Sequence, residues 1–187
     1  MAAITNIQYN PTISHVPGAM WTIMRFNLMQ HKRVIPQLLD TYHFYFNESL
    51  IGYTFVQTEP LGLMCYIRDN CIPAVVIFDS LTGEPAVLSD SRILLHKRII
   101  DDPSTGFSVM PHPLDFYAQG HEKLICVSGP LSGYVGYIVR VHRDRKFVFA
   151  VGRGITFGVS AILQSKFLTM KEYDRLPEHE KFAVVIQ

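Results

Sequence analysis

The sequence predicts an α+β protein, in which an N-terminal α/β sandwich is followed by a small all-β barrel. Residues 20–101 alternate strand-like and helix-like patterns, whereas residues 121–170 contain only strand-like patterns separated by short turns. Residues 102–120, between these two regions, are rich in Pro and Gly. We therefore expect a first domain over 20–101, a linker over 102–120 and a second domain over 121–170, with an N-terminal extension (1–19) and a C-terminal tail (171–187).

The first domain is predicted to place its helices on a sheet. Its expected elements are strand 20–26, helix 30–43, strand 51–58, helix 59–70, strand 74–78 and a helix after Ser89. Pro36 lies inside the first helical pattern and either starts a shorter helix or kinks a longer one. Ser89 can cap the third helix, and the negative charge of Asp90 suits its positive end.

The second domain is predicted from four runs of strand-like residues. They are 124–127, 134–141, 146–151 and 159–162. About fifty residues of short antiparallel strands favour a small barrel, because closure of a sheet removes its exposed edges.

The charge of the chain is unevenly distributed. The net charge is +1, but residues 118–170 carry seven Lys or Arg against two Asp or Glu, and residues 1–117 carry seven against ten. This is either ordinary surface variation or a sign of two domains with different partners. In the second case, the basic domain would face nucleic acid or the ribosome.

Several classes of protein are not supported. No run approaches the roughly 18 to 20 apolar residues of a membrane helix, and residues 1–19 lack the pattern of a secretory signal. Three Cys without a zinc-like spacing predict reduced thiols in a cytoplasmic protein. No catalytic motif includes any of the eight His. We therefore expect no enzyme activity, no cofactor and no metal, and an enzyme of unknown activity stays the weakest alternative.

A glycine-rich segment resembles a known motif. Residues 128–139 read SGPLSGYVGYIV and contain Gly129, Gly133 and Gly136. A strand that ends in a Gly-Pro turn, a small loop and a glycine that opens the next strand resemble a KOW motif. These glycines suit turns with positive φ and the close passage of two backbones.

Upstream residues make the resemblance more specific. Trp21 opens the first strand, residues 51–56 (IGYTFV) match a "PGYVFV" segment, and residues 84–90 (EPAVLSD) match a "P-x-P-L-S-D" helix entry. In their order and spacing, residues 20–170 resemble the NusG-type transcription elongation factors, especially their specialised antiterminator paralogues. The resemblance implies a NusG-like N-terminal α/β sandwich and an SH3-like KOW barrel, without catalysis or a cofactor.

The resemblance also implies partners. In this family the N-terminal domain docks on the clamp helices of bacterial RNA polymerase through an apolar, aromatic-lined depression. The KOW domain recruits a termination factor, antitermination partners or the ribosome. Carried over by position, Trp21, Leu50 and Tyr53 are the candidate polymerase-binding residues. The alternative is that Trp21 and Tyr53 belong to an ordinary core.

The chain departs from the family at two places. Ile51 stands where the family has proline. Residues 42–49 form a short segment where the family usually has a longer, basic one. Phe44, Tyr45 and Phe46 make this segment apolar, which suggests a contact with a protein.

A cluster of cations marks the second domain. Its members are Arg140, Arg143, Arg145, Lys146 and Arg153. Coulomb attraction to phosphate would give weak, salt-dependent contact with RNA or DNA. The alternative is a solvated hairpin whose charges keep an edge soluble. Little aromatic interleaving accompanies these cations, so base stacking is not predicted. An RNA- or ribosome-binding KOW protein without polymerase binding is therefore the second functional hypothesis.

Overall fold

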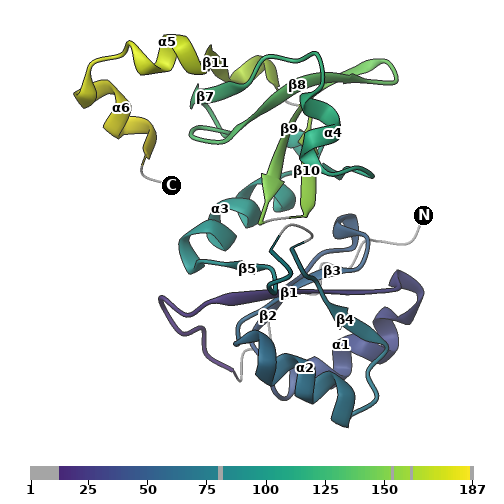
Figure 1. The fold of residues 1–187 in the computed structure, drawn as a ribbon. Helices are drawn as coiled ribbons and strands as arrows, with labels where there is room; N and C mark the ends of the chain where they lie inside the picture. Colours follow the sequence, from purple (N-terminus) through teal and green to yellow (C-terminus); the bar gives the residue numbers. More distant parts are fainter. Residues whose placement is uncertain (1–12, 80–81, 153, 161, 186–187) are drawn as a thin grey trace. The chain divides into compact units, whose positions relative to one another are not determined.

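The computed structural model describes residues 13–79, 82–152, 154–160 and 162–185. The chain divides into two compact units, residues 1–94 and residues 95–187 (Figure 1). We call them unit 1 and unit 2. The protein is α+β, with a mixed α/β region in unit 1 and an antiparallel sheet in unit 2. No helix among the described residues is long and apolar enough to cross a membrane.

Unit 1 is built on an antiparallel sheet with β1 at its centre. The strands are β1 (Trp21–Phe26), β2 (Phe44–Phe46), β3 (Tyr53–Val56), β4 (Ala74–Val76) and β5 (Val87–Leu88). Their order is β2-β3-β1-β4, and β5 also pairs with β1. The three strands predicted for this region are confirmed as β1, β3 and β4, and each is shorter than its expected run.

Two helices cover one face of this sheet. Figure 1 shows α1 (His31–Leu39) and α2 (Pro60–Asp69) on the same side of the strands. Strand residues point alternately to opposite faces, so Met24 and Phe26 of β1 share the helix-covered face. The core on this face consists of Met24, Phe26, Val34, Ile35, Leu38, Phe44, Phe46, Val56, Leu63, Ile72 and Val76. Pro36 lies within α1 and is exposed, so the helix runs through it.

Strand β2 was not expected from the sequence. Phe44, Tyr45 and Phe46 pair with β3, and all three side chains are buried. Phe44 and Phe46 face the helices, whereas the ring of Tyr45 stacks on Phe55 of β3. The predicted contact between this aromatic run and a partner protein is therefore wrong, because the sheet itself buries the rings.

Unit 2 contains a six-stranded antiparallel sheet. The strands are β6 (Ser108–Val109), β7 (Leu124–Ser128), β8 (Val135–Val141), β9 (Asp144–Val151), β10 (Ile155–Val159) and β11 (Lys166–Thr169). Their order is β11-β7-β8-β9-β10-β6, and no pairing between the described residues of β11 and β6 closes it into a barrel. The expected strand over 159–162 lies instead at Ile155–Val159, whose five residues are all buried.

The segment expected as a linker is largely folded. It contains the 3-10 turn η3 (Pro103–Thr105), strand β6 and helix α4 (Leu114–Ala118). The hydroxyl of Thr105 donates to the carbonyl of Ile99, and the backbone N–H of Met110 donates to the carbonyl of Thr156. The division between the units falls earlier, inside α3 (Asp90–Asp101). Pro and Gly here mark short turns between small elements, not an extended connection.

The C-terminal tail is helical. It contains α5 (Met170–Asp174) and α6 (Glu178–Val185). Thr169 and Glu172 form a capping box at the start of α5, in which each side chain bonds the other residue's backbone N–H. Tyr173 is buried and packs with Ile125 of β7, so α5 belongs to the fold of unit 2.

The three glycines of the KOW-like segment occupy constrained positions. Gly129 and Gly133 have φ angles of 93° and 82°, and the N–H of Gly133 donates to the carbonyl of Cys126 at 2.6 Å. Gly136 lies on β8, where a Cβ atom would overlap the backbone carbonyl of Val148 on β9. The first two are thus required by the turn, and the third by the close approach of two strands.

We expect Gly136→Ala to lower the free energy of unfolding of the chain by at least about 2 kcal/mol, because the added methyl group forces β8 and β9 apart. Urea denaturation followed by circular dichroism measures this. The control is Gly62→Ala in α2, where a Cβ would make ordinary contact with Glu59. This control should match or slightly exceed wild-type stability. Equal stability of both variants would contradict the close approach at Gly136.

Candidate functional site

A row of three side chains crosses the sheet of unit 1 on the face opposite α1 and α2. Arg25 on β1 is in register with Tyr53 on β3 and with Val75 on β4. The guanidinium of Arg25 lies over the Tyr53 ring, 5.0 Å from its centroid. Val75 is 61% exposed and Tyr53 is half-buried. This row presents an aromatic ring, a cation and an apolar side chain to a partner.

The row borders a depression in unit 1. The hollow has a volume of about 520 Å³, and its lining residues are Arg25, Phe26, Asn27, Leu28, Ile51, Pro73, Ala74 and Val75. Most of these side chains are apolar. No carboxylate of the described residues forms an ion pair with Arg25. The depression therefore suits an apolar partner that also brings a negative charge.

Ile51 stands at the edge of this depression in a strained conformation. It is 51% exposed and has a φ of 53°, which a β-branched residue rarely adopts. The next residue, Gly52, has a φ of 87°, and a Cβ there would overlap the carbonyl of Phe26. The tight turn into β3 thus holds an apolar side chain outward at a conformational cost. Such strain is often found at functional positions.

The sequence-predicted docking residues do not all reach this surface. Leu50 is 0% exposed and Trp21 is also buried, so their side chains are not accessible to a partner. Tyr53 lies in the exposed row. Arg25, Ile51 and Val75 were not singled out from the sequence. Arg25 is the charged residue of the run WTIMRF, and this break in a mostly apolar strand could have indicated it.

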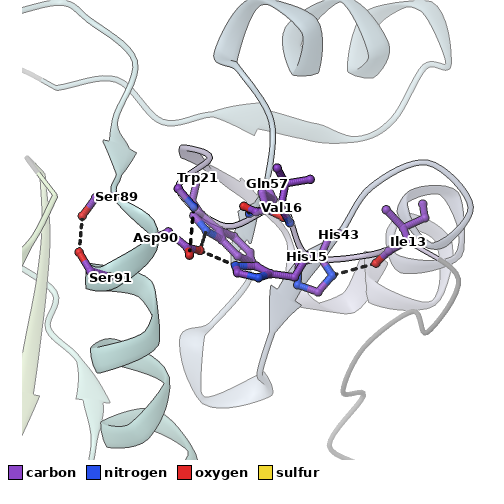
Figure 2. A network of polar contacts seen from close by, with 10 residues as sticks. Ile13, His15, Val16, Trp21, His43, Gln57, Ser89, Asp90 and Ser91 are labelled. Atoms are coloured by element: carbon purple, nitrogen blue, oxygen red, sulfur yellow. Dashed lines mark hydrogen bonds and ion pairs between the residues drawn. The ribbon is translucent and has the colours of Figure 1, made fainter.

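Trp21 has a different role, which Figure 2 shows. Its indole N–H donates to Asp90 Oδ1 at 2.8 Å, and His15 Nε2 lies 2.6 Å from the same oxygen. The backbone N–H of Gly18 approaches Asp90 Oδ2 at 3.5 Å. Burial by itself would raise the pKa of Asp90, but the hydrogen bonds from His15, Trp21 and Gly18 outweigh it and lower the pKa. Asp90 thus joins the start of α3 to β1 and to the segment that precedes it.

The same segment is held at two further points. The side-chain amide of Gln57 accepts from the N–H of Val16 at 3.0 Å and donates to its carbonyl at 2.7 Å. His43 Nδ1 donates to the carbonyl of Ile13 at 3.2 Å, and its ring meets that of Trp21 edge-on at 5.4 Å. The described part of the N-terminal extension, residues 13–19, is therefore bonded to the sheet of unit 1 (Figure 2).

The basic cluster lies on the β8–β9 hairpin of unit 2. Arg140 on β8 is directly opposite Arg145 on β9, and Arg143 occupies the turn between them. These three side chains are exposed and form no ion pair with the described carboxylates. Lys146 differs, because its ammonium donates to the hydroxyl of Ser108 on β6 at 2.8 Å. Arg153, the fifth predicted residue, lies outside the described residues.

Comparisons with models of known protein families, with curated proteins and with solved structures found no match for this chain. Within the described residues, no group of three or more His, Cys, Asp or Glu side chains is placed to hold a metal ion. The candidate sites are thus the depression of unit 1 and the basic hairpin of unit 2, both suited to binding.

We expect Asp90→Asn to lower the free energy of unfolding by about 1 to 2 kcal/mol at pH 7, because hydrogen bonds to a charged acceptor are stronger than those to an amide. The pKa of Asp90 is lowered by folding, so its contribution is present above the ordinary Asp pKa and disappears as the pH falls below it. Urea titrations of wild type and Asp90→Asn should show this difference in the free energy of unfolding at pH 7 and a smaller difference at pH 3. Asp69→Asn, at an exposed ion pair with Arg68, is the control and should change little.

We also expect the stability of the chain to fall between pH 7 and pH 5, partly through His43. Burial lowers the pKa of this imidazole more than the Ile13 carbonyl and Asp90 raise it, and nearby His15 lowers it further. The unfolded chain therefore binds this proton first, and stability is lost as the pH falls through about 6.5. Melting temperatures across this range should fall less steeply for His43→Gln. Parallel curves for both proteins would contradict the assignment.

Proposed function

We propose that the protein is a NusG-type transcription elongation regulator, of the antiterminator kind, that binds RNA polymerase through unit 1. In this proposal unit 1 is the NusG-like N-terminal domain, and the depression beside Tyr53 receives the polymerase clamp helices. Unit 2 is the KOW domain, and it recruits a termination factor, antitermination partners or the ribosome. The proposal involves no catalysis and no cofactor.

The exposed row formed by Tyr53, Arg25 and Val75 carries the proposal. Tyr53 is one of the three residues that the family pattern places at the polymerase-facing surface, and it is half-buried beside Arg25, which lines a mostly apolar hollow. On the face opposite the helices, Arg25 and Val75 are exposed, so a helical partner can approach the sheet at this end. Apolar side chains around an aromatic anchor are typical of the centre of a protein interface.

Two further observations support the proposal. Ile51 replaces the family's proline and still projects an apolar side chain at the edge of the depression. In unit 2, Gly129 and Gly133 have positive φ angles and Gly136 lies where β8 and β9 approach closely, which is compatible with a KOW-like segment. Leu50 and Trp21 support the surface indirectly, since Leu50 precedes the strained turn and Trp21 fixes the start of β1.

Binding of purified chain to immobilised core RNA polymerase tests the proposal. We expect Tyr53→Ala, Ile51→Asn and Val75→Asp each to weaken binding at least tenfold, because Ile51 and Val75 line the depression and Tyr53 supports the guanidinium of Arg25 at its edge. Ile51→Asn should also stabilise the chain by about 1 kcal/mol, since Asn tolerates the left-handed conformation. Weaker binding by a more stable protein cannot result from unfolding.

The matched control is Leu163→Asp, which changes an exposed leucine of unit 2 and should bind like wild type. Leu50→Asp is unsuitable, because a carboxylate at a fully buried position would unfold unit 1. If the wild-type chain does not bind polymerase, the proposal fails, and an RNA- or ribosome-binding protein becomes the better hypothesis. Normal binding by all three variants would place the docking surface elsewhere.

A further inference from the structure

One edge of the sheet of unit 1 has no neighbouring strand among the described residues. In the order β2-β3-β1-β4, the outer strands are β2 and β4. The three residues of β2 are at most 4% exposed, so that edge is covered. At the other edge, Val75 of β4 is 61% exposed, and Phe78, which continues the strand through a bridge with Pro85, is 46% exposed. Residues 74–78 thus form an open edge.

The outer side of this open edge carries unused backbone groups. In an antiparallel sheet, successive residues direct their N–H and C=O groups alternately to one side of the strand and to the other. The N–H of Ile77 donates to the carbonyl of Ile23 on β1 at 2.9 Å, so Ile77 and Val75 direct their N–H groups towards β1. The outward groups belong to the alternate residues, Ala74, Val76 and Phe78. Within the described part of the chain, one of these groups has a partner, since the N–H of Ala74 donates to the carbonyl of Ile72 at 2.8 Å.

The open edge lacks the features that prevent pairing with a further strand. Residues 74–78 read AVVIF, without a charge or a proline, and their register with β1 is unbroken by a bulge. Soluble proteins protect exposed edges with Lys, Pro, a bulge or a covering segment. β-branched and aromatic residues have the opposite effect, because they pack well across neighbouring strands. The open edge is therefore suited to receive another strand.

The outward groups match those of a second copy of the same segment. In an antiparallel pairing centred on Val76, Ala74 lies opposite Phe78 of the second copy, and Val75 lies opposite Ile77. The two Val76 residues exchange two hydrogen bonds, and each Phe78 N–H donates to the Ala74 carbonyl of the other copy. The smallest side chain meets the largest at both ends, and no like charges face each other. The bond between Ala74 and Ile72 stays intact in this register.

The neighbouring helix extends this surface with apolar side chains. The hydroxyl of Tyr66 on α2 donates to the carbonyl of Gln37 on α1, so this flank of α2 faces α1. Leu61 and Met64 lie on the other side of the helix, and they are 69% and 39% exposed. Because α2 contacts β4, the outermost strand, this second flank is on the side of the open edge.

We propose that the chain self-associates through the open edge, as a dimer in which residues 74–78 of two copies pair antiparallel. A two-fold axis between the Val76 residues uses the same surface on both copies, so the contact closes on itself and does not build a fibre. Five residues a side make a small interface, so the dimer is weak and its population depends on concentration.

Sedimentation velocity of the full-length chain, from micromolar to millimolar concentration, tests this proposal. We expect the average mass to rise towards that of two chains and no further. Phe78→Pro should weaken the association at least tenfold, because proline removes the N–H that bonds the second copy. This N–H has no partner within the described part of one copy, so the substitution removes no hydrogen bond from the fold.

A second variant and a control separate lost association from lost folding. Val75→Lys keeps every backbone group, places a charge in the apolar pairing, and should also weaken the association at least tenfold. The matched control is Val87→Lys, which changes an exposed valine of β5 outside the paired segment and should associate like wild type. Melting temperatures at micromolar concentration should be similar for wild type, Val75→Lys and Val87→Lys.

Disulfide cross-linking tests the register of the pairing. In a Cys71→Ser background, which removes an exposed thiol, Val75→Cys and Ile77→Cys chains are oxidised alone and as an equimolar mixture. The mixture should form a covalent dimer, because directly opposite residues bring their Cα atoms to about 4.5 Å. Each variant alone should cross-link far less, because identical residues then lie diagonally, about 7 to 8 Å apart.

Three outcomes would overturn the proposal. They are a wild-type chain that stays monomeric at every concentration, normal association of Phe78→Pro and Val75→Lys, and equal cross-linking of the mixture and the single variants. In the first case, the open edge would suit an extended segment of a different protein. The assays contain no polymerase, and Tyr53→Ala should associate normally, so this proposal stands or fails independently of the proposed function.

Discussion

The alternation of side chains along β1 is the constraint on which unit 1 depends. β1 pairs with β3, β4 and β5, so its two faces set the two faces of the whole sheet. Met24 and Phe26 enter the core beneath the helices, and Arg25 between them must point the other way. A shift of register by one residue would exchange these sets and place a guanidinium in the core. The exposed row across the sheet thus follows from the burial of its neighbours.

The two ends of β1 have different electrostatic roles. At its start, the indole N–H of Trp21 donates a hydrogen bond to the carboxylate of Asp90. The carboxylate is mostly buried, so leaving it unpaired would be costly. At its end, Arg25 rests on the face of Tyr53, where its charge stays accessible to solvent. The first arrangement stabilises the fold, and the second leaves a charge available for a partner. One strand therefore joins a structural network to a candidate binding surface.

Unit 2 illustrates how a backbone constraint and a surface charge share the same strands. Gly136 permits the close approach of β8 and β9 near the middle of the sheet. Beyond it, the same two strands extend into a hairpin that places Arg140 opposite Arg145. The repulsion between them is tolerated because Val139 and Val148 bury the hairpin's base against α4. Core packing thus offsets an electrostatic cost at the tip.

The sequence by itself determined the elements that have a strong local pattern. The bulky and β-branched residues of 20–26 and the β-branched run at 74–78 predicted β1 and β4, and the glycines of 128–139 predicted the turn before β8. Tertiary structure decided what has no local signal. Three aromatic residues became a buried strand because β3 offered an unpaired edge, and a Pro-rich segment folded because β10 and β8 bound it. Leu50 is buried and its neighbour Ile51 is exposed. Hydrophobicity alone cannot distinguish these two apolar residues, because the strained turn sets which side chain points outward.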